Sequence, residues 1–427
     1  MNGSSTAPSR TLAEWLGYIE RQHPKSIALG LDRVREVATR MQLTRPARRV
    51  ITVAGTNGKG STVAFIESIA RAAGWKVGAY TSPHLLAYNE RMRIDGVDAS
   101  DEVLVAAFDA VEAVRGDTAL TYFEYGTLAA LWLFQRGNLD LAVLEVGLGG
   151  RLDAVNLVDA DVAVLTTVDL DHQDWLGNDR ETIGREKAGI ARAGRPLVLG
   201  EDDPPSSVLG HAYAIGAAAI RAGCDFFFAP MEEGRWQWRE IGAAFELPSP
   251  RLAAPSQLRN AATAIAALRA LPDVVPAHAY ALGVAEAELP GRLQRFSRAG
   301  VEVVVDVGHN PQAARELHAW LQQAPVSGRT RAVFAALGDK DIAGIVSALA
   351  GDIDDWFLAG LEDVGARGLS VDAFAQRLRG SAADGGEKFA NVATALTAAL
   401  DGARAGDRVL VFGSFHTVAA ALPLLQG

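Results

Sequence analysis

The sequence predicts an α/β protein with two domains, each built on a mostly parallel, doubly wound sheet. Short apolar runs alternate with helix-like segments along most of the chain, a pattern typical of parallel sheets. The 427 residues are too many for one ordinary hydrophobic core. Polar clusters follow the apolar runs directly, at the edge where open parallel sheets bind ligands. We place the domain boundary at the Pro290-Gly291-Arg292 turn, which gives domains 1–289 and 290–427.

The composition is that of an ordinary soluble globular protein, with 49% hydrophobic and 22% charged residues. A net charge of −10 argues against nucleic acid as a partner, because phosphate backbones attract clustered Lys and Arg. The single cysteine, Cys224, excludes a disulfide framework and a cysteine zinc cluster, and we expect it to be buried.

No apolar run reaches the roughly 18 residues that a membrane span requires. Residues 1–10 are polar and lack the apolar core of a signal peptide, and we expect them to be disordered. The sequence therefore predicts a cytoplasmic protein without a membrane partner, and we expect a monomer.

The first domain contains a glycine-rich loop between a strand and a helix. Two amphipathic helices are expected over 11–23 and 32–41, followed by a strand over 50–54 and the string Gly55-Thr-Asn-Gly-Lys59-Gly-Ser61-Thr62. Such a loop wraps polyphosphate, because backbone N–H groups approach the oxygens closely and the helix dipole favours negative charge. We expect Lys59 to reach the β/γ-phosphates and the hydroxyl of Ser61 or Thr62 to face Mg2+. The alternative is a turn that only joins the strand to the helix.

One glycine departs from the usual phosphate-loop pattern. Gly60 stands between Lys59 and Ser61. This insertion resembles the P-loop subgroup of ATP-dependent amide ligases that includes the muramyl peptide ligases and the folate-glutamate ligases.

Further polar residues stand near strand ends and helix starts. A strand over 76–85 breaks at Pro83 and carries Ser82, and Tyr88–Arg91 follows in a predicted loop. Glu124 precedes an apolar helix, where an acid can also simply stabilise the helix dipole.

Two candidate metal ligands follow. The apolar strand over 139–146 carries Glu145 near its carboxyl end, the position of a Mg2+-holding acid behind a phosphate loop. His172 follows the next strand, over 161–167, and we expect it beside Glu145 as a metal ligand, although a lone histidine is more often structural.

The remaining elements continue the alternation. In the first domain we expect a helix over 181–193 with Lys187, a strand over 196–200, short β elements over 201–255 and a helix over 257–271 with Asn260. In the second domain we expect strands over 301–307, 331–337, 356–359 and 408–412, whose ends carry Asp306, His309, the string Gly338-Asp-Lys-Asp and Ser414.

The ordered strings GTNGKGST, TSPHL with YNER, LEVGLGGRLDA, DHQDWLG with REKAGI, LPGRL, DVGHNP, GDKD and FGSFHTV closely resemble the bifunctional dihydrofolate synthase/folylpolyglutamate synthases. The resemblance runs from about Thr11 to the C-terminus. It implies a P-loop ATPase domain followed by a Rossmann-like domain. It also implies a ligase that uses ATP and Mg2+, with K+ as an optional further cation. ATP would phosphorylate a carboxylate of dihydropteroate or of a tetrahydrofolate, and the amine of L-glutamate would displace the phosphate.

The same resemblance implies roles for individual residues. ATP is expected at Gly58, Lys59, Gly60, Ser61, Asn260, Arg292 and Asp306. Mg2+ is expected at Ser82, Glu145 and His172. Dihydropteroate is expected at Leu29, Gly30, Thr121, Tyr122, Phe123, Glu124, Leu152, Asp153 and Ala154. L-Glutamate is expected at His309 and Ser414. Catalytic roles are expected for Lys59, Lys187 and His309.

Lys187 matches a lysine that this family carries in carbamylated form, N6-carboxylysine, whereas an unmodified lysine here could be a solvated helical cation. Tyr122 stands where the family pattern has phenylalanine, a change that keeps a ring for stacking on the pterin.

Other interpretations remain open from sequence. They are a folylpolyglutamate synthase without dihydropteroate activity, a muramyl-type amino-acid ligase, and a nucleotide-binding regulatory switch. The pterin-pocket segments favour the bifunctional enzyme, and a switch would not need a second α/β domain rich in polar strand ends.

Overall fold

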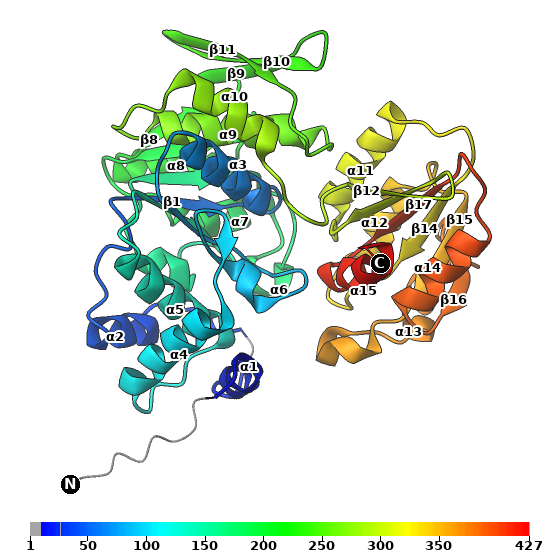
Figure 1. The fold of residues 1–427 in the computed structure, drawn as a ribbon, viewed down its shortest axis with the longest axis horizontal. Coiled ribbons are helices and arrows are strands. Elements are labelled where there is room, and N and C mark those ends of the chain that lie inside the picture. The colour runs from blue at the N-terminus through cyan, green and yellow to red at the C-terminus, as the bar shows by residue number, and fades with distance from the viewer. Residues whose placement is uncertain (1–9, 26, 427) are drawn as a thin grey trace. The chain divides into compact units, whose positions relative to one another are not determined.

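The computed structural model describes residues 10–25 and 27–426, which form two compact units (Figure 1). The first unit contains the described residues up to Val168, with 178–249 and 260–286, and the second contains 169–177, 250–259 and 287–426. We did not expect 169–177 and 250–259 to group with the later residues. The boundary at 289/290 stays a prediction, and the predicted disorder of 1–10 falls mostly outside the described residues.

The first unit is built on an eight-stranded sheet with the order β4-β3-β2-β5-β1-β6-β7-β8. The six strands β2, β5, β1, β6, β7 and β8 run parallel to one another. At one edge of the sheet, β3 is antiparallel to β2 and β4 is antiparallel to β3. The bounds are β1 Arg49–Ala54, β2 Val77–Tyr80, β3 Met92–Ile94, β4 Val97–Asp98, β5 Leu141–Glu145, β6 Val162–Leu165, β7 Pro196–Leu199 and β8 Ala218–Arg221. The central strands are almost wholly apolar because helices cover both faces of the sheet (Figure 1).

The helices predicted over 11–23, 32–41, 181–193 and 257–271 begin within one residue of the observed starts. The helices Ser206–Ile215 and Ala277–Glu286 were not predicted, and Glu124 lies in the first turn of its helix and not before it. The bounds of the helices of this unit are α1 Leu12–Glu20, α2 Asp32–Arg40, α3 Lys59–Ala72, α4 Asp101–Arg115, α5 Tyr122–Arg136, α7 Arg180–Ala188, α8 Ser206–Ile215, α9 Ser256–Arg269 (residues 260–269 lie in this unit) and α10 Ala277–Glu286, with short 3-10 helices η1 Tyr88–Arg91 and η2 Ala154–Leu157. Thr11 caps α1. The predicted loop at Tyr88–Arg91 is the helix η1, and the carboxylate of Glu90 tightens it by accepting the N–H groups of three preceding residues.

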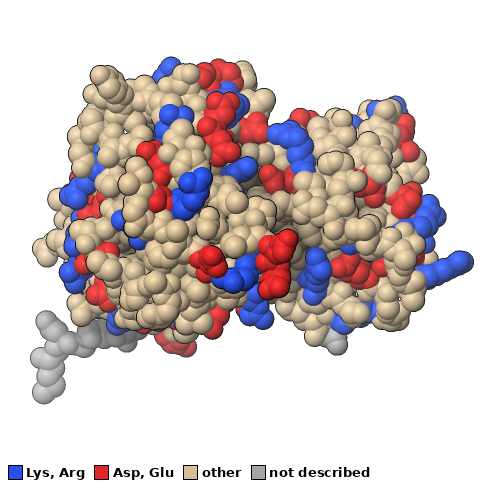
Figure 2. All heavy atoms as spheres, turned by 90° about the horizontal axis from the view of Figure 1, so that it is seen from above, with Lys and Arg blue, Asp and Glu red and all other residues tan. Residues whose placement is uncertain are grey.

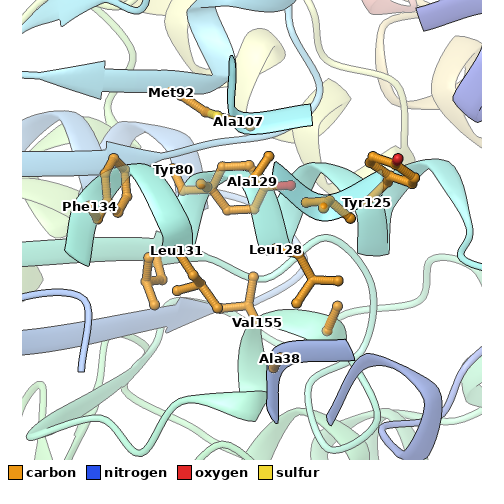
Figure 3. Packing of buried hydrophobic residues seen from close by; sticks show 14 of the residues in the cluster. Ala38, Tyr80, Met92, Ala107, Tyr125, Leu128, Ala129, Leu131, Phe134 and Val155 are labelled. Atoms are coloured by element: carbon orange, nitrogen blue, oxygen red, sulfur yellow. The ribbon is translucent and has the colours of Figure 1, made fainter. Parts of the chain in front are cut away.

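One apolar cluster of the first unit surrounds α5. Figure 3 shows Tyr125, Leu128, Ala129, Leu131 and Phe134 of this helix among Ala38, Tyr80, Met92, Ala107 and Val155. Because α5 is buried on most of its circumference, its first turn is held firmly in place.

A small antiparallel sheet with the order β11-β10-β9 confirms part of the predicted short β elements over 201–255, whereas α8 occupies the start of that stretch. Its strands are β9 Phe226–Pro230, β10 Arg235–Glu240 and β11 Ala243–Pro248, and Trp236 and Trp238 are fully buried in it. The expectation that Cys224 is buried was wrong, since it is exposed. It follows Gly223 (φ +73°) in the turn after β8, where the side chain has no core to enter.

The second unit has a six-stranded sheet with the order β12-β13-β17-β14-β15-β16, in which only β12 is antiparallel to its neighbour. The strands are β12 Gln294–Arg298, β13 Val301–Asp306, β14 Thr330–Phe334, β15 Asp355–Ala359, β16 Glu387–Phe389 and β17 Arg408–Phe412. The helices are α6 Gln173–Leu176, α11 Pro311–Gln323, α12 Ile342–Ala348, η3 Glu362–Arg367, α13 Val371–Arg377, α14 Val392–Asp401 and α15 Phe415–Gln426. Among the described residues of the chain, no helix has the length and apolar character needed to cross a membrane.

Candidate active site

The glycine loop joins β1 to α3 with backbone that only glycine adopts easily. Gly58 (φ +83°) precedes α3, and a Cβ there would lie 2.5 Å from Oδ1 of Asn260. A Cβ on Gly55 (φ +153°) would lie 1.8 Å from Oγ1 of Thr166. The loop is therefore closely packed and leaves its backbone N–H groups at the start of a helix, as phosphate binding requires. Asn260, a predicted ATP residue, lies directly against it.

Two lysines converge on one carbonyl oxygen of this loop. Nζ of Lys59 donates to the carbonyls of Gly55 at 3.0 Å and Thr56 at 3.1 Å. Nζ of Lys187, on α7, also donates to the Gly55 carbonyl at 3.0 Å. Lys187 is only 5% exposed. Lys187 is thus not a solvated helical cation.

The first turn of α3 supplies hydroxyl groups beside the loop. Ser61 and Thr62 are both buried, and Oγ1 of Thr62 has no hydrogen-bond partner within residues 10–25 and 27–426. Burying a hydroxyl group without a hydrogen-bond partner costs free energy, and a bound ligand atom would remove this cost. The loop therefore fits a phosphate-bound metal ion.

Two predicted metal ligands meet at the ends of neighbouring strands. The backbone N–H of Ser82, just after β2, donates to Oε2 of Glu145 at 3.0 Å, and Glu145 ends β5. Glu145 is 4% exposed. A hydroxyl and a carboxylate are hard oxygen donors of the kind that Mg2+ prefers. Within the described residues, no group of three or more His, Cys, Asp and Glu is arranged to hold a metal, so an ion here would rely on few protein ligands.

His172 was expected to follow the strand next to the one that carries Glu145, and this expectation was wrong. β1 lies between β5 and β6 in the sheet, so the strand before His172 is not the neighbour of the strand that carries Glu145. His172 lies beyond the end of β6, at the start of α6, and its segment belongs to the second unit. The order of strands along the chain therefore differs from their order in the sheet. The role of His172 as a metal ligand stays a prediction.

Glu124 has a structural role at the start of α5. Its Oε2 accepts the N–H of Thr121 at 2.8 Å and the Thr121 hydroxyl at 2.9 Å, which completes a capping box. Its Oε1 lies 2.8 Å from Nε of Arg33 on α2. The alternative of a helix-stabilising acid is thus observed, and a contact of Glu124 with dihydropteroate stays a prediction. Arg33 was missed, because no sequence pattern pairs residues so far apart.

The other residues predicted for dihydropteroate form contacts around the loop after β5. Gly30 N–H donates to the carbonyl of Leu152 at 3.2 Å, which joins 29–30 to 152–154. Asp153 is buried and accepts the N–H groups of Leu148 and Val155, each at 2.9 Å. Burial raises the pKa of Asp153 to about 7, although these two N–H groups act in the opposite direction. The ring of Phe123 faces Gly147, where a Cβ would lie 2.7 Å from it.

In the second unit, Arg292 and Asp306 lie close together. Asp306 accepts the N–H groups of Leu293 at 3.0 Å and Gly308 at 2.7 Å. Burial raises the pKa of Asp306, and the charge of Arg292 opposes this effect. The Arg292 guanidinium also lies 5.6 Å from the centre of the Phe415 ring.

The two predicted glutamate residues have partners within this unit. Nδ1 of His309 lies 3.0 Å from the carbonyl of Val307. Oγ of Ser414 accepts the N–H of Thr417 at 3.0 Å and therefore caps α15. The structure gives Ser414 a structural role, and its contact with glutamate stays a prediction.

Asp171 and Lys340 form a buried pair that sequence reasoning missed. Nζ of Lys340 lies 2.7 Å from Oδ1 of Asp171, and the two side chains are 7% and 10% exposed. Nδ2 of Asn310 lies 3.3 Å from Oδ2 of Asp171, and Nε2 of His309 lies 3.7 Å from it. Burial would raise the pKa of Asp171, but His309 and Lys340 hold it well below its usual range. This pair attaches 169–177 to the second unit.

Comparisons with known proteins show the family of this chain. Residues 53–225 match the Mur ligase middle domain, and residues 291–415 match the Mur ligase, glutamate ligase domain. The chain is 48% identical to the dihydrofolate synthase/folylpolyglutamate synthase of Escherichia coli K12, with 97% of this chain and 96% of the relative covered. The chain belongs to the dihydrofolate synthase/folylpolyglutamate synthase family. The fold predicted from sequence, a P-loop domain followed by a Rossmann-like domain, is confirmed.

Solved structures of this family match the whole chain. E. coli FolC in complex with DHPP and ADP is 47% identical, with a TM-score of 0.92 and 98% of each chain covered. A bifunctional folylpolyglutamate synthase/dihydrofolate synthase with Mn, AMPPNP and L-glutamate bound is 45% identical, with a TM-score of 0.90 and coverage of 98% and 99%. The family and its structures do not favour a muramyl ligase or a regulatory switch.

Proposed function

We propose that this chain is an ATP-dependent ligase that joins L-glutamate to dihydropteroate, forming dihydrofolate, and to tetrahydrofolates, forming folylpolyglutamates. The observation that carries the proposal is the phosphate loop with its two converging lysines, in a chain that matches this enzyme family over nearly its full length. The relatives with ADP, AMPPNP, Mn and L-glutamate bound support ATP, a divalent ion and glutamate as ligands.

Amide formation requires an activated carboxylate. The substrate carboxylate takes the γ-phosphoryl group of ATP and becomes an acyl phosphate, and the glutamate amine then displaces phosphate. The backbone of Gly58 to Ser61 holds the phosphates, and Lys59 neutralises charge that grows in the transition state. Positioning supplies much of the rate.

The metal site would be made by Ser82, Glu145 and His172. Mg2+, when bound there, neutralises the phosphate oxygens and favours phosphoryl transfer. Ser82 and Glu145 already touch, as such a site requires. We infer that Lys187 is carbamylated, because a carboxylated side chain accepts hydrogen bonds and attracts a cation, whereas an ammonium group repels one.

The remaining predicted residues are assigned within the same proposal. Asn260, Arg292 and Asp306 would contact ATP, and His309 and Ser414 would contact glutamate. We keep K+ as an optional cation, and a monomeric, cytoplasmic enzyme as our expectation. On the face drawn in Figure 2, Lys and Arg are interspersed with Asp and Glu, which supports small-molecule partners over nucleic acid.

The test is phosphate release with ATP, Mg2+ and L-glutamate, supplying dihydropteroate, tetrahydrofolate or a muramyl peptide in turn. We expect release with the first two substrates, and a loss of at least about a hundredfold in the Lys59→Ala variant with unchanged circular dichroism. Phosphate release with tetrahydrofolate alone would mean that the enzyme is a folylpolyglutamate synthase without dihydropteroate activity. Release with the muramyl peptide alone would refute the proposal.

A further inference from the structure

Arg91 is a buried arginine without an acidic partner. It ends η1 and is 9% exposed. Arg408, the other arginine this deeply buried among the described residues, pairs with Glu302 at 2.7 Å. Arg91 forms no ion pair with any carboxylate of residues 10–25 and 27–426, and its Nε donates to Nδ1 of His84 at 2.8 Å. Burying a cation beside a neutral partner costs free energy, so we expect Arg91 to have a function that offsets this cost.

The carboxylate nearest in sequence is fully occupied elsewhere. Glu90 accepts the backbone N–H groups of Leu85, Leu86 and Ala87, each at 2.7 Å. The guanidinium of Arg91 lies instead near two aromatic rings, 5.2 Å from the centre of Tyr88 and 5.6 Å from that of Tyr122. Ring faces stabilise a cation only partly, so the positive charge of Arg91 remains uncompensated.

The free donors of Arg91 face accessible space. The terminal N–H groups of Arg91 have no hydrogen-bond partner among the described residues. Their nitrogen atoms are nevertheless not among the fully buried polar atoms that lack a partner, so they remain accessible. A guanidinium that is fixed at Nε, flanked by rings and open at its terminal nitrogens suits a planar anion, which it can bind with two parallel hydrogen bonds.

We propose that Arg91 binds the α-carboxylate of the glutamyl group in folate substrates, an inference that rests on the proposed function. Tyr122 belongs to the segment proposed for the pterin substrate, so Arg91 lies beside that pocket. The carbonyl of Arg91 accepts the N–H of Thr81, the residue before Ser82, at 2.9 Å. Arg91 thus lies between the pterin segment and the proposed metal site, along the path of the substrate's carboxyl end.

The two substrates differ at this point. Dihydropteroate has one carboxylate, which must reach the phosphate loop to react. A folate has a reacting γ-carboxylate and, in addition, an α-carboxylate that does not react. An anion receptor separate from the phosphate loop therefore serves folates alone, and Arg91 determines how well the enzyme accepts them relative to dihydropteroate.

The test measures equilibrium binding of dihydropteroate and dihydrofolate, which differ by the glutamyl group, to wild type, Arg91→Met and Arg91→Lys. We expect Arg91→Met to weaken dihydrofolate about 10- to 100-fold, the loss typical of a charge-assisted bond. The loss for dihydropteroate should be at least about tenfold smaller. Arg91→Lys keeps the charge but not the bidentate geometry, so its selective loss should be intermediate.

Arg136→Met is the matched control, since Arg136 also stacks on a ring, Trp132 at 4.0 Å, but at the other end of α5. It should leave both affinities unchanged. An equal loss for both ligands in Arg91→Met and Arg91→Lys, or no loss for either, would overturn the proposal. Arg91→Lys decides the matter if Arg91→Met does not fold.

Failure of the proposed function has a different signature. In that case wild type itself releases no phosphate with dihydropteroate or tetrahydrofolate. If wild type turns over both substrates and the Arg91 variants do not discriminate between them, the ligase stands and only the role of Arg91 is rejected.

Discussion

Lys59 and Lys187 donate to the same carbonyl oxygen, that of Gly55. Two ammonium groups this close repel each other, and both would repel a metal ion at Glu145. Carbamylation of Lys187 removes this conflict, because it replaces one positive charge by a negative one. The buried position of Lys187 protects such a group from water.

We therefore expect Lys187→Ala to lose most of its ligase activity while remaining folded. A small carboxylate such as acetate should restore part of the activity, because it replaces the missing acceptor. Lys59→Ala serves as the control and should not respond to acetate. The assay is phosphate release with and without acetate. A fully active Lys187→Ala enzyme would reject carbamylation as a functional feature.

Asp153 should make stability depend on pH. Its pKa is raised by burial to about 7, whereas an unfolded aspartate titrates near pH 3.9. Between these values the native state holds a proton that the unfolded state has lost, so the free energy of unfolding falls as pH rises from about 4 to about 7. The total change is of the order of a few kcal/mol.

Asp153→Asn removes this titration. Urea unfolding at pH 5 and at pH 7.5 should show a smaller fall in stability for the variant than for wild type. Equal falls in the two proteins would mean that Asp153 ionises normally in the native state.

Several contacts of single residues could be predicted from sequence, and others could not. Ser82 follows β2 and Glu145 ends β5, and the ends of parallel strands meet at one edge of the sheet. Arg33 with Glu124, and Asp171 with Lys340, are partners across distant segments. No local pattern encodes such pairs, so only the structure revealed them.

At the scale of elements, the segment 169–177 is the least expected feature. It follows β6 in sequence but groups with the second unit, where the Asp171–Lys340 pair holds it. His172, the predicted metal ligand, lies in this segment. The pair therefore fixes the position of His172 relative to the second unit.

Lys340→Met should loosen this segment. Removing one partner of a buried ion pair costs about 3–5 kcal/mol, because the other charge stays buried. Hydrogen exchange of the amides in 169–177 should become faster, and Asp171→Asn should partly relieve the defect in the double variant. If exchange in 169–177 is unchanged in Lys340→Met, the pair does not hold the segment.

The accuracy of the predicted elements followed the strength of the local signal. α1 begins after Thr11, whose hydroxyl accepts the N–H of Glu14, and it lies within the predicted range 11–23. α8 was missed because its N-cap, Pro205, offers no side-chain hydrogen bond and the helix contains Gly210. β3 and β4 are only a few residues long, too short for a periodic signal.

At the scale of the whole molecule, alternating strands and helices correctly predicted two α/β sheets. Strand order could not be predicted in the same way, because a crossover can place the next strand on either side of the first. This limit explains why the strand before His172 was wrongly expected beside the strand that carries Glu145. The resemblance to a ligase family predicted the function, whereas periodicity alone predicted only the fold.

We propose that the chain activates a carboxylate of dihydropteroate as an acyl phosphate and transfers the acyl group to glutamate. The most direct measurement uses dihydropteroate labelled with 18O in both carboxylate oxygens, together with ATP, Mg2+ and L-glutamate. We predict that each dihydrofolate formed retains one labelled oxygen in its amide and that the released phosphate carries the other. Unlabelled phosphate, or phosphate release without dihydrofolate, would rule out transfer through an acyl phosphate of dihydropteroate.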